Sequence, residues 1–271
     1  MTKKTNTSQK LLQQAGDLGL PYGQELSFKL LPGRLLDDRL LLGWQARDFA
    51  PLRFIAWLEQ THGLPAPAAD ALRERAPLAN TVGLSIEAEE GQVLFKAYLE
   101  FWEPIRARMQ AGTLGPEPQL LHYGIKWQAQ GEAYAQAEYH VQPQLTAYDI
   151  VKRIQALHPP GRHSLALGTA NALVQRGSTR APGAPMLYLE AREAGNARQS
   201  CDINLYKTGL RLEDAAPLLR ELGAVLGVPA PVLEAHLQAH AALPLGHVAA
   251  GTDRHGQDFL SIYLGVRELE P

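Results

Sequence analysis

The chain has 271 residues, and its 26 Lys and Arg against 28 Asp and Glu give a formal net charge of −2 at pH 7. This near balance gives no electrostatic reason to expect a nucleic acid or an anionic membrane as a partner. The single cysteine, Cys201, excludes an intramolecular disulfide and a cysteine-rich zinc site, and it suits a reducing compartment, so we expect a cytoplasmic protein. We expect neither a signal peptide nor a transmembrane helix, because no apolar run has the length that either requires.

Pairs of strand-like runs, separated by stretches of helical character, follow one another along the chain. The first pair spans residues 24–44, and two helical stretches, 47–58 and 67–76, come after it. The second and third strand pairs span 80–102 and 119–141. The first half of the chain therefore reads as helices set between hairpins.

The second half repeats this order. Thr146, with Asp149 three residues later, is typical of a helix N-terminus. We expect 176–185 to be a long surface loop that leads into the fourth strand pair. Two helices, one ending at Gly227 and one starting at Pro229 or Pro231, separate the fourth pair from the fifth. The fourth and fifth strand pairs span 186–207 and 246–266.

This order predicts the fold class. The helices must cover the apolar face of the sheet, so the polar face points away from them. If the ten strands close on themselves, the polar face lines a lumen. We therefore predict an α+β fold, a single antiparallel ten-stranded barrel of five hairpins with a polar lumen, ringed by α-helices. No linker divides the chain, so we expect one domain over residues 1–271.

Alternation along each run predicts which side chains face the lumen, because successive side chains of a strand point to opposite faces. In 91–102, for example, Phe95, Ala97 and Leu99 form the apolar face. The strands near Lys126 and Gly246 alternate less cleanly. The residues expected inside are Ser27, Lys29, Gly83, Ser85, Glu87, Leu94, Lys96, Tyr98, Glu100, His122, Gly124, Lys126, Tyr134, Gln136, Glu138, His140, Tyr188, Glu190, Arg192, Ser200, Asp202, Asn204, Tyr206, Phe259, Ser261, Tyr263 and Gly265.

These residues carry a family resemblance. Lys96-Ala97-Tyr98 resembles the Lys-x-Tyr strand motif of the indole branch of the ABBA-type (prenyltransferase-barrel) aromatic prenyltransferases. Asn204-Leu205-Tyr206 resembles the Asn-x-Tyr strand ending of the phenol branch, and 246–266 resembles the last hairpin, in which a tyrosine closes the barrel. The chain departs from the indole branch at 202–206, where Asp202 and Asn204 replace two cations, and at Ser261, which has no lysine beside Tyr263.

The resemblance implies transfer of a dimethylallyl or longer prenyl group from its diphosphate to an electron-rich aromatic, indole or guanidine acceptor, in a small molecule or a peptide. It implies no cofactor, and Mg²⁺ that is not required or is needed only weakly. Cations would neutralise the leaving diphosphate, and aromatic faces would shield the allyl cation. The candidates for the diphosphate are Lys29, Lys96, Lys126, Arg192 and Asn204. The candidates for the shield are Tyr98, Tyr134, Tyr188, Tyr206 and Tyr263.

The carboxylates Glu87 and Glu100 are the candidates for catalysis and acceptor recognition, because they lie on the same hairpin as Lys96. Either could take an indole or phenol proton or hold a guanidinium. The alternative is that they only neutralise the cations beside them.

Two other functions stay open. One is a barrel without catalysis that binds a small ligand or a peptide, and the other is a scaffolding protein with a split sheet. We expect a monomer with no metal site.

Overall fold

The computed structural model describes residues 6–89, 92–129, 131–159, 161–193, 195–196 and 198–270. Its strands form a closed barrel in the order β1-β10-β9-β8-β7-β6-β5-β4-β3-β2. The strands are β1 (Tyr22–Leu31), β2 (Arg34–Gln45), β3 (Thr81–Glu89), β4 (Gln92–Glu100), β5 (Gln119–Gln128), β6 (Tyr134–Gln142), β7 (Leu187–Arg192), β8 (Gln199–Asn204), β9 (Leu245–Thr252) and β10 (Asp258–Leu269).

Eight α-helices within the described ranges surround this antiparallel barrel, which confirms the predicted fold class. They are α1 (Asn6–Asp17), α2 (Pro51–His62), α3 (Ala66–Arg75), α4 (Trp102–Gln110), α5 (Ala147–Ala156), α6 (Leu165–Arg180), α7 (Leu212–Leu226) and α8 (Ala230–His240). Two short 3-10 helices, η1 (Ala76–Leu78) and η2 (Tyr206–Thr208), complete the chain. None of the helices in these ranges has both the length and the apolar content needed to cross a membrane.

The helix ends follow the local signals in the sequence. Thr146 and Asp149 form a reciprocal capping box at the start of α5. Gly227 ends α7 in the left-handed conformation, with φ 70°, which glycine adopts without steric cost. Pro229 precedes α8, as expected.

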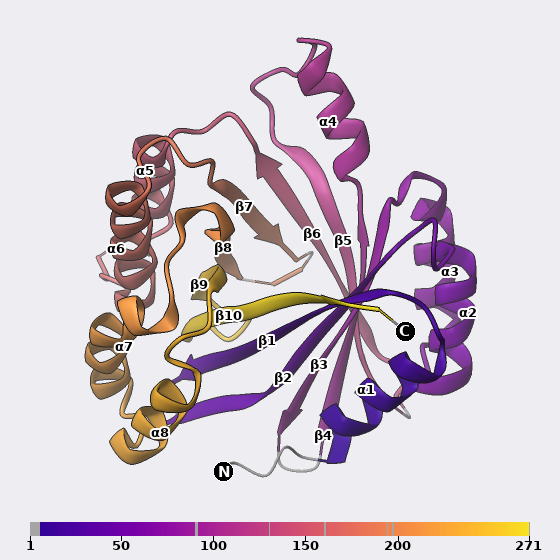
Figure 1. The fold of residues 1–271 in the computed structure, drawn as a ribbon, viewed down its shortest axis with the longest axis horizontal. Helices are drawn as coiled ribbons and strands as arrows, with labels where there is room; N and C mark the ends of the chain where they lie inside the picture. Colours follow the sequence, from indigo (N-terminus) through magenta and orange to yellow (C-terminus); the bar gives the residue numbers. More distant parts are fainter. Residues whose placement is uncertain are drawn as a thin grey trace. The chain divides into compact units, whose positions relative to one another are not determined.

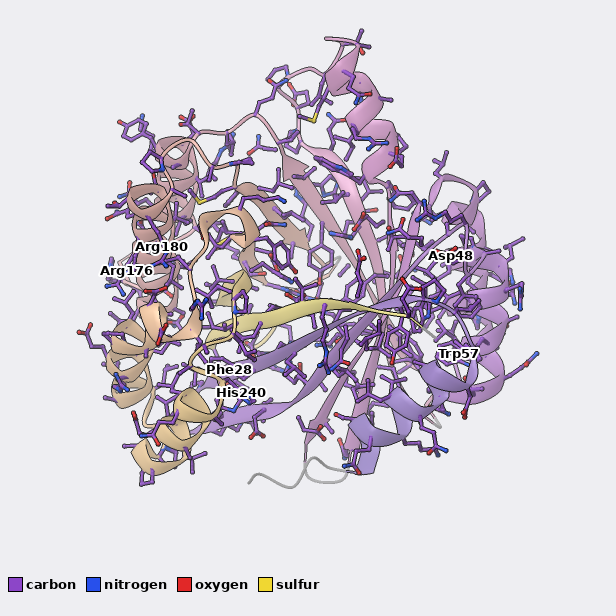
Figure 2. All side chains as sticks on the ribbon, viewed as in Figure 1. Phe28, Asp48, Trp57, Arg176, Arg180 and His240 are labelled. Atoms are coloured by element: carbon purple, nitrogen blue, oxygen red, sulfur yellow. The ribbon has the colours of Figure 1, made fainter. Side chains whose placement is uncertain are left out.

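The predicted loop over 176–185 is wrong in its first half, because α6 continues to Arg180. Arg176 and Arg180, both labelled in Figure 2, bind the backbone and side chain of Asp214 on α7 and so hold this last turn. Gly177 lies within this helix and allows close packing. A Cβ at Gly177 would lie 2.9 Å from the Thr208 side chain.

The chain divides into two compact units. The first comprises Met1–Glu25, Asp38–His140 and Arg267–Pro271, and the second comprises Leu26–Asp37 and Val141–Val266. Both contribute strands to the barrel. The expectation of one domain over 1–271 stays a prediction.

An aromatic cluster forms the core between α2 and the strands in the first unit. The Trp44 ring of β2 packs 5.7 Å from Phe49 and 5.9 Å from Trp57 between ring centroids, and Trp57 is labelled on α2 in Figure 2. Phe95 of β4 packs against His62 at the end of α2. These contacts define the outer face of the strands, and we call the opposite face the inner face.

In the second unit, α5, α6, α7 and α8 cover the outer face, and Figure 1 shows them in succession, from α5 to α8. The core beneath them includes Ile203 of β8, Val248 of β9 and Ile262 of β10, all at most 1% exposed. Cys201 belongs to the same core, and its Sγ lies 3.8 Å from the carbonyl oxygen of Ala250. Ser200, Asp202 and Asn204 alternate with these core residues and therefore occupy the inner face, as predicted.

Candidate functional site

A buried group of cations surrounds one carboxylate on the inner face of the first unit. Lys96 Nζ donates to Glu87 Oε2 at 2.8 Å, and Arg39 Nε lies 3.4 Å from the same oxygen. The side chains are 11%, 12% and 4% exposed for Lys96, Glu87 and Arg39, respectively. We call these residues, together with Lys126, the basic cluster.

The strand register explains why these side chains meet. Arg39 of β2 lies directly opposite Glu87 of β3, and Lys96 of β4 lies directly opposite Lys126 of β5. Directly opposed residues of an antiparallel pair project from the same face. The basic cluster thus brings three cations and one carboxylate together on the inner face. Several cations in a poorly hydrated place are suited to bind a multiply charged anion.

Arg39 was missed in the sequence. Leucines occupy both parities of β2, at Leu40, Leu41 and Leu42, so alternation does not reveal which face Arg39 occupies. Arg39 lies directly opposite Glu87 and therefore shares the inner face with it.

Aromatic side chains lie farther along the same inner face. Gly124 of β5 lies opposite Tyr98 of β4, and a Cβ at Gly124 would be 3.2 Å from the Tyr98 ring. The ring of Tyr139 lies 6.0 Å from those of both Tyr98 and His122. The absence of a side chain at Gly124 therefore lets Tyr98 lie across β5, where Tyr139 and His122 complete an aromatic group.

The prediction that Tyr134 faces the lumen is wrong. Tyr139 shares the inner face with Tyr98, so Tyr134, five residues earlier on β6, points to the outer face, together with Glu138 and His140. Tyr123 stacks under Arg75 of α3, and its pKa is raised by burial, with smaller contributions from Tyr134 and Glu138. Only the alanines Ala135 and Ala137 mark the inner parity of β6 before Tyr139, so alternation predicts the outer face for this apolar parity.

Glu100 is held at the end of β4. Asn80 Nδ2 donates to its carboxylate at 3.3 Å, Thr81 Oγ1 donates at 3.4 Å, and His122 Nδ1 lies 3.8 Å away. These polar partners set Glu100 apart from Glu87, which pairs with the cations Lys96 and Arg39.

In the second unit, a histidine that we did not predict joins the inner face. His247 Nδ1 lies 2.8 and 2.9 Å from the two carboxylate oxygens of Asp202. The imidazole stacks on the Tyr263 ring with 3.8 Å between centroids and 11° between planes. The strand register shifts at this point, which explains why alternation near Gly246 was irregular.

Asn204 and Tyr206 lie beside this histidine, but each makes a different contact. Asn204 lies opposite His247, and its Oδ1 accepts a hydrogen bond from the backbone N–H of Tyr206 at 3.2 Å. This bond is typical of a residue that starts a turn, and η2 begins at Tyr206. The Tyr206 ring lies 6.1 Å from that of His247.

Lys29 lies on the inner face, as predicted. Phe28 faces α8, where its ring is 4.6 Å from His236 and His236 is 4.7 Å from His240; Phe28 and His240 are labelled in Figure 2. Lys29 therefore points the opposite way, and its Nζ lies 4.9 Å from the Phe259 ring centre.

A second ionic group lies near Phe259. Arg198 lies 5.9 Å from the Phe259 ring centre, donates to Ser200 Oγ at 2.9 Å and pairs with the buried Glu193. Glu193 also accepts from Arg254 at 3.4 Å. Alternation within strands could not predict Arg198, Glu193 or Arg254, because each of these residues lies just before or just after a strand.

The predictions for β7 are wrong. Tyr188 lies opposite Ile203 and Glu190 lies opposite Cys201, so both side chains share the outer face with the helix-covered core. Burial, above all, raises the pKa of Tyr188, with further contributions from Cys201 and Glu190, and its hydroxyl donates to Glu190 at 3.4 Å. Arg192 has the same parity, pairs with Glu190 at 3.5 Å and is 58% exposed. Tyr188, expected to shield the prenyl group, and Arg192, expected to bind the diphosphate, therefore do not face the lumen.

No group of three or more His, Cys, Asp or Glu side chains suited to a metal ion occurs in the part of the chain that the structure describes.

No protein-family model matches the sequence, and no curated protein matches it. Solved structures match the fold. The crystal structure of NotF prenyltransferase matches with a TM-score of 0.51 and 12% identity, over 89% of this chain and 80% of that chain. NotF in complex with brevianamide F and DMSPP matches with a TM-score of 0.50 and 12% identity, over 89% of this chain and 79% of that chain. AnaPT from Neosartorya fischeri has a TM-score of 0.48 and 12% identity, over 92% of this chain and 79% of that chain. The two NotF matches show that this chain shares the fold of the NotF prenyltransferase, as the sequence motifs predicted.

Proposed function

We propose that the protein is a prenyltransferase that binds a prenyl diphosphate at the basic cluster and transfers the prenyl group to an electron-rich acceptor. The observation that carries the proposal is the convergence of Lys96 and Arg39 on one oxygen of Glu87, with Lys126 opposite Lys96. The shared fold with NotF, which has been solved with DMSPP and brevianamide F, supports a prenyl diphosphate and an aromatic acceptor.

The chemistry fits the cluster. Ionisation of an allylic diphosphate leaves negative charge on the pyrophosphate oxygens, and cations fixed in a poorly hydrated site stabilise that charge. Glu87 would yield its two cations to the incoming diphosphate, whose several oxygens can accept more hydrogen bonds than one carboxylate can. The faces of Tyr98 and Tyr139 would shield the allyl cation from water.

The experiment is turnover of radiolabelled dimethylallyl diphosphate by the purified chain. Tryptophan, a tryptophan-containing cyclic dipeptide, tyrosine and an arginine peptide serve as acceptors, with and without EDTA. We expect prenylated product and an equal amount of pyrophosphate, without a requirement for Mg²⁺. Absence of both products with every acceptor and with longer prenyl diphosphates would overturn the proposal.

A barrel that binds its ligand without catalysis is the second candidate. Glu87 already neutralises part of the positive charge of the basic cluster. The empty site is therefore stable, as a protein that only binds its ligand requires. Calorimetric binding of the diphosphate without pyrophosphate release would identify this second function. We further propose a cytoplasmic, monomeric protein.

A further inference from the structure

Glycines of three neighbouring strands lie side by side on the inner face of the first unit. Gly43 of β2 lies directly opposite Gly83 of β3. A Cβ at Gly23 of β1 would lie 3.8 Å from the carbonyl oxygen of Gly43. Gly23 has the inner parity, because the adjacent Tyr22 packs on the outer aromatic cluster, 6.0 Å from the Trp44 ring. We call Gly23, Gly43 and Gly83 the glycine row.

Neither the backbone conformation nor the packing requires glycine at Gly23 or Gly43. Neither residue has a positive φ. Within the described part of the chain, and apart from the adjacent residues, a Cβ at either position would have only a backbone carbonyl oxygen within 4 Å, at 3.8 or 3.9 Å. Glycine weakens the interior of a strand and often marks a place where a ligand approaches the backbone closely. These two glycines therefore leave space over the sheet that a side chain would otherwise occupy.

An aliphatic and an aromatic side chain border the glycine row. Tyr98 lies opposite Gly83, but its ring lies toward Gly124 on β5, where a Cβ would be 3.2 Å from two ring carbons. At Gly83 the nearest Tyr98 atom to a Cβ is its own Cβ, at 3.7 Å, so the ring leaves Gly83 uncovered. Leu41 Cδ1 would lie 3.8 Å from the same position. An apolar chain that lies over the row would contact both side chains.

Ser85 is an independent indication of a ligand, at the end of the row that adjoins the basic cluster. It lies two residues from Gly83 on β3, directly opposite Lys96 of β4. Ser85 is 5% exposed, and its hydroxyl has no hydrogen-bond partner within the described ranges. A buried hydroxyl without a partner costs free energy. An oxygen of a diphosphate bound at Lys96 would accept the missing hydrogen bond.

We infer that the glycine row holds the prenyl chain of the donor, and that this donor is geranyl diphosphate rather than dimethylallyl diphosphate; the inference rests on the proposed function. The diphosphate binds at the basic cluster and Ser85, and the chain runs from there over Gly83 and Gly43 to Gly23. Transfer breaks the bond between the allylic carbon and the diphosphate oxygen, whose electron pair leaves with pyrophosphate. The acceptor forms its new bond to that carbon and releases a proton.

The width of the glycine row fits two isoprene units. Neighbouring strands lie about 4.8 Å apart, so the row extends ~10 Å from Gly83 to Gly23. An extended chain advances roughly 1.2 Å per bond, so a dimethylallyl chain reaches about 4 Å and a geranyl chain about 9 Å. The shorter chain ends before Gly23, whereas the longer chain covers the whole row. Space at Gly23 therefore serves a geranyl group and not a dimethylallyl group.

The test compares Gly23→Val and Gly43→Val with the wild-type chain, on both diphosphates and with one acceptor. Valine suits an extended strand, and its methyl groups fill the space over the row. We expect the wild type to have a kcat/KM for geranyl diphosphate at least equal to that for dimethylallyl diphosphate. In each variant the ratio should shift about 10–200-fold against geranyl, the usual discrimination of an apolar pocket. Gly115→Val, at a glycine outside the row with open space around it, is the matched control.

Calorimetry measures binding of the chain without turnover. The wild type should bind an unreactive geranyl thiolodiphosphate more tightly than its dimethylallyl counterpart, and with a more negative heat-capacity change, because more apolar surface is buried. Gly23→Val should remove this difference while its affinity for pyrophosphate stays that of the wild type. Ser85→Ala should weaken both analogues and pyrophosphate by the same factor, roughly tenfold, because Ser85 contacts the diphosphate alone.

The outcomes distinguish the two proposals. A wild-type chain that binds both analogues with the expected preference but forms no product overturns the proposed enzyme and supports the assignment of the row. A wild type that binds neither analogue overturns both. An active wild type that uses dimethylallyl but not geranyl diphosphate overturns the inference alone. Folded valine variants that weaken both donors equally, or that change only the KM of the acceptor, also overturn it.

Discussion

Lys96 donates diagonally across the β3–β4 hairpin to Glu87, and the oxygen that accepts this bond also lies 3.4 Å from the Arg39 guanidinium. One carboxylate oxygen of Glu87 is therefore engaged with two cations. This geometry favours neutralisation of the cluster over the other role considered for Glu87, recognition of the acceptor. Glu100, held by Asn80 and Thr81, is the carboxylate for which acceptor recognition stays a prediction.

We expect Lys96→Ala to cut prenyl transfer while the fold stays intact. Loss of one fixed charge that stabilises the leaving pyrophosphate should raise the activation free energy by roughly 2–4 kcal/mol, or about 30- to 1,000-fold in kcat. The measurement is turnover of labelled dimethylallyl diphosphate, with circular dichroism to confirm folding. The control is Lys152→Ala, because Lys152 is an exposed lysine of α5 that lies over the Tyr148 ring. A folded Lys96→Ala variant with unaltered turnover would remove Lys96 from the site.

Glu87→Gln should destabilise the empty protein and strengthen its binding of pyrophosphate. The neutral amide leaves Lys96 and Arg39 without their shared charge partner, and a buried ion pair that loses one member costs about 3–5 kcal/mol of stability. Pyrophosphate replaces the missing charge, so it should raise Tm more in this variant than in the wild type.

The control for that prediction is Glu234→Gln, which breaks an exposed pair with Arg220 at 2.8 Å. Its effect on the free energy of unfolding should be small, because solvent screens an exposed ion pair. Equal pyrophosphate shifts in Glu87→Gln and the wild type would contradict the neutralising role of Glu87.

Arg192→Ala should leave turnover unchanged, contrary to what the sequence suggested. Arg192 lies on the outer face, is 58% exposed and pairs with Glu190 at 3.5 Å. The free energy of unfolding should change by no more than about 0.5 kcal/mol, which chemical denaturation can measure. A tenfold loss of diphosphate affinity in this variant would show that β7 presents the opposite face.

His62 should make the protein less stable in acid. Burial, with a smaller contribution from Lys10, lowers the pKa of His62 to about 4 from its ordinary 6.5. The unfolded chain therefore binds a proton between these values that the folded chain does not. The free energy of unfolding should fall as pH decreases from about 6.5 to about 4, by roughly 3 kcal/mol in all.

His62→Phe should flatten this pH dependence, because the ring packs between Trp57 and Phe95 and its Nε2 makes no hydrogen bond. The measurement is urea denaturation across that pH range, with His255→Gln as the control at an exposed histidine. If the slopes of wild type and His62→Phe agree, another group is responsible for acid lability.

The fold could be predicted because hairpins and helices alternate along the whole chain, and the face of a strand could be predicted where one parity is clearly apolar. In β8, Cys201 and Ile203 lie against the helices as expected. In β7 the same rule failed, because both faces of a closed barrel are enclosed. Leu187, Leu189 and Ala191 occupy the inner face there, whereas Tyr188 satisfies its hydroxyl through Glu190 inside the outer core.

The candidate site could be predicted only in part, because the face of a residue is clear only where its strand alternates cleanly. Lys96 and Glu87 could be found because their hairpin alternates cleanly, with Phe95, Ala97 and Leu99 on the other face. Arg39 could not, because leucines surround it on both parities. His247 could not, because alanines occupy both parities of β9, at Ala249 and Ala250, so alternation does not reveal which face His247 occupies.

The placement of Cys201 gives the protein an internal reporter of its own unfolding. This thiol is the chain's single cysteine, is 1% exposed and lies beneath the α5–α8 helix layer, and burial raises its pKa, so little reactive thiolate forms in the folded state. A thiol reagent can reach Cys201 only when the helices separate from β8. The rate of labelling therefore measures how often that core opens, without any engineered probe, and a ligand that tightens the second unit should slow it.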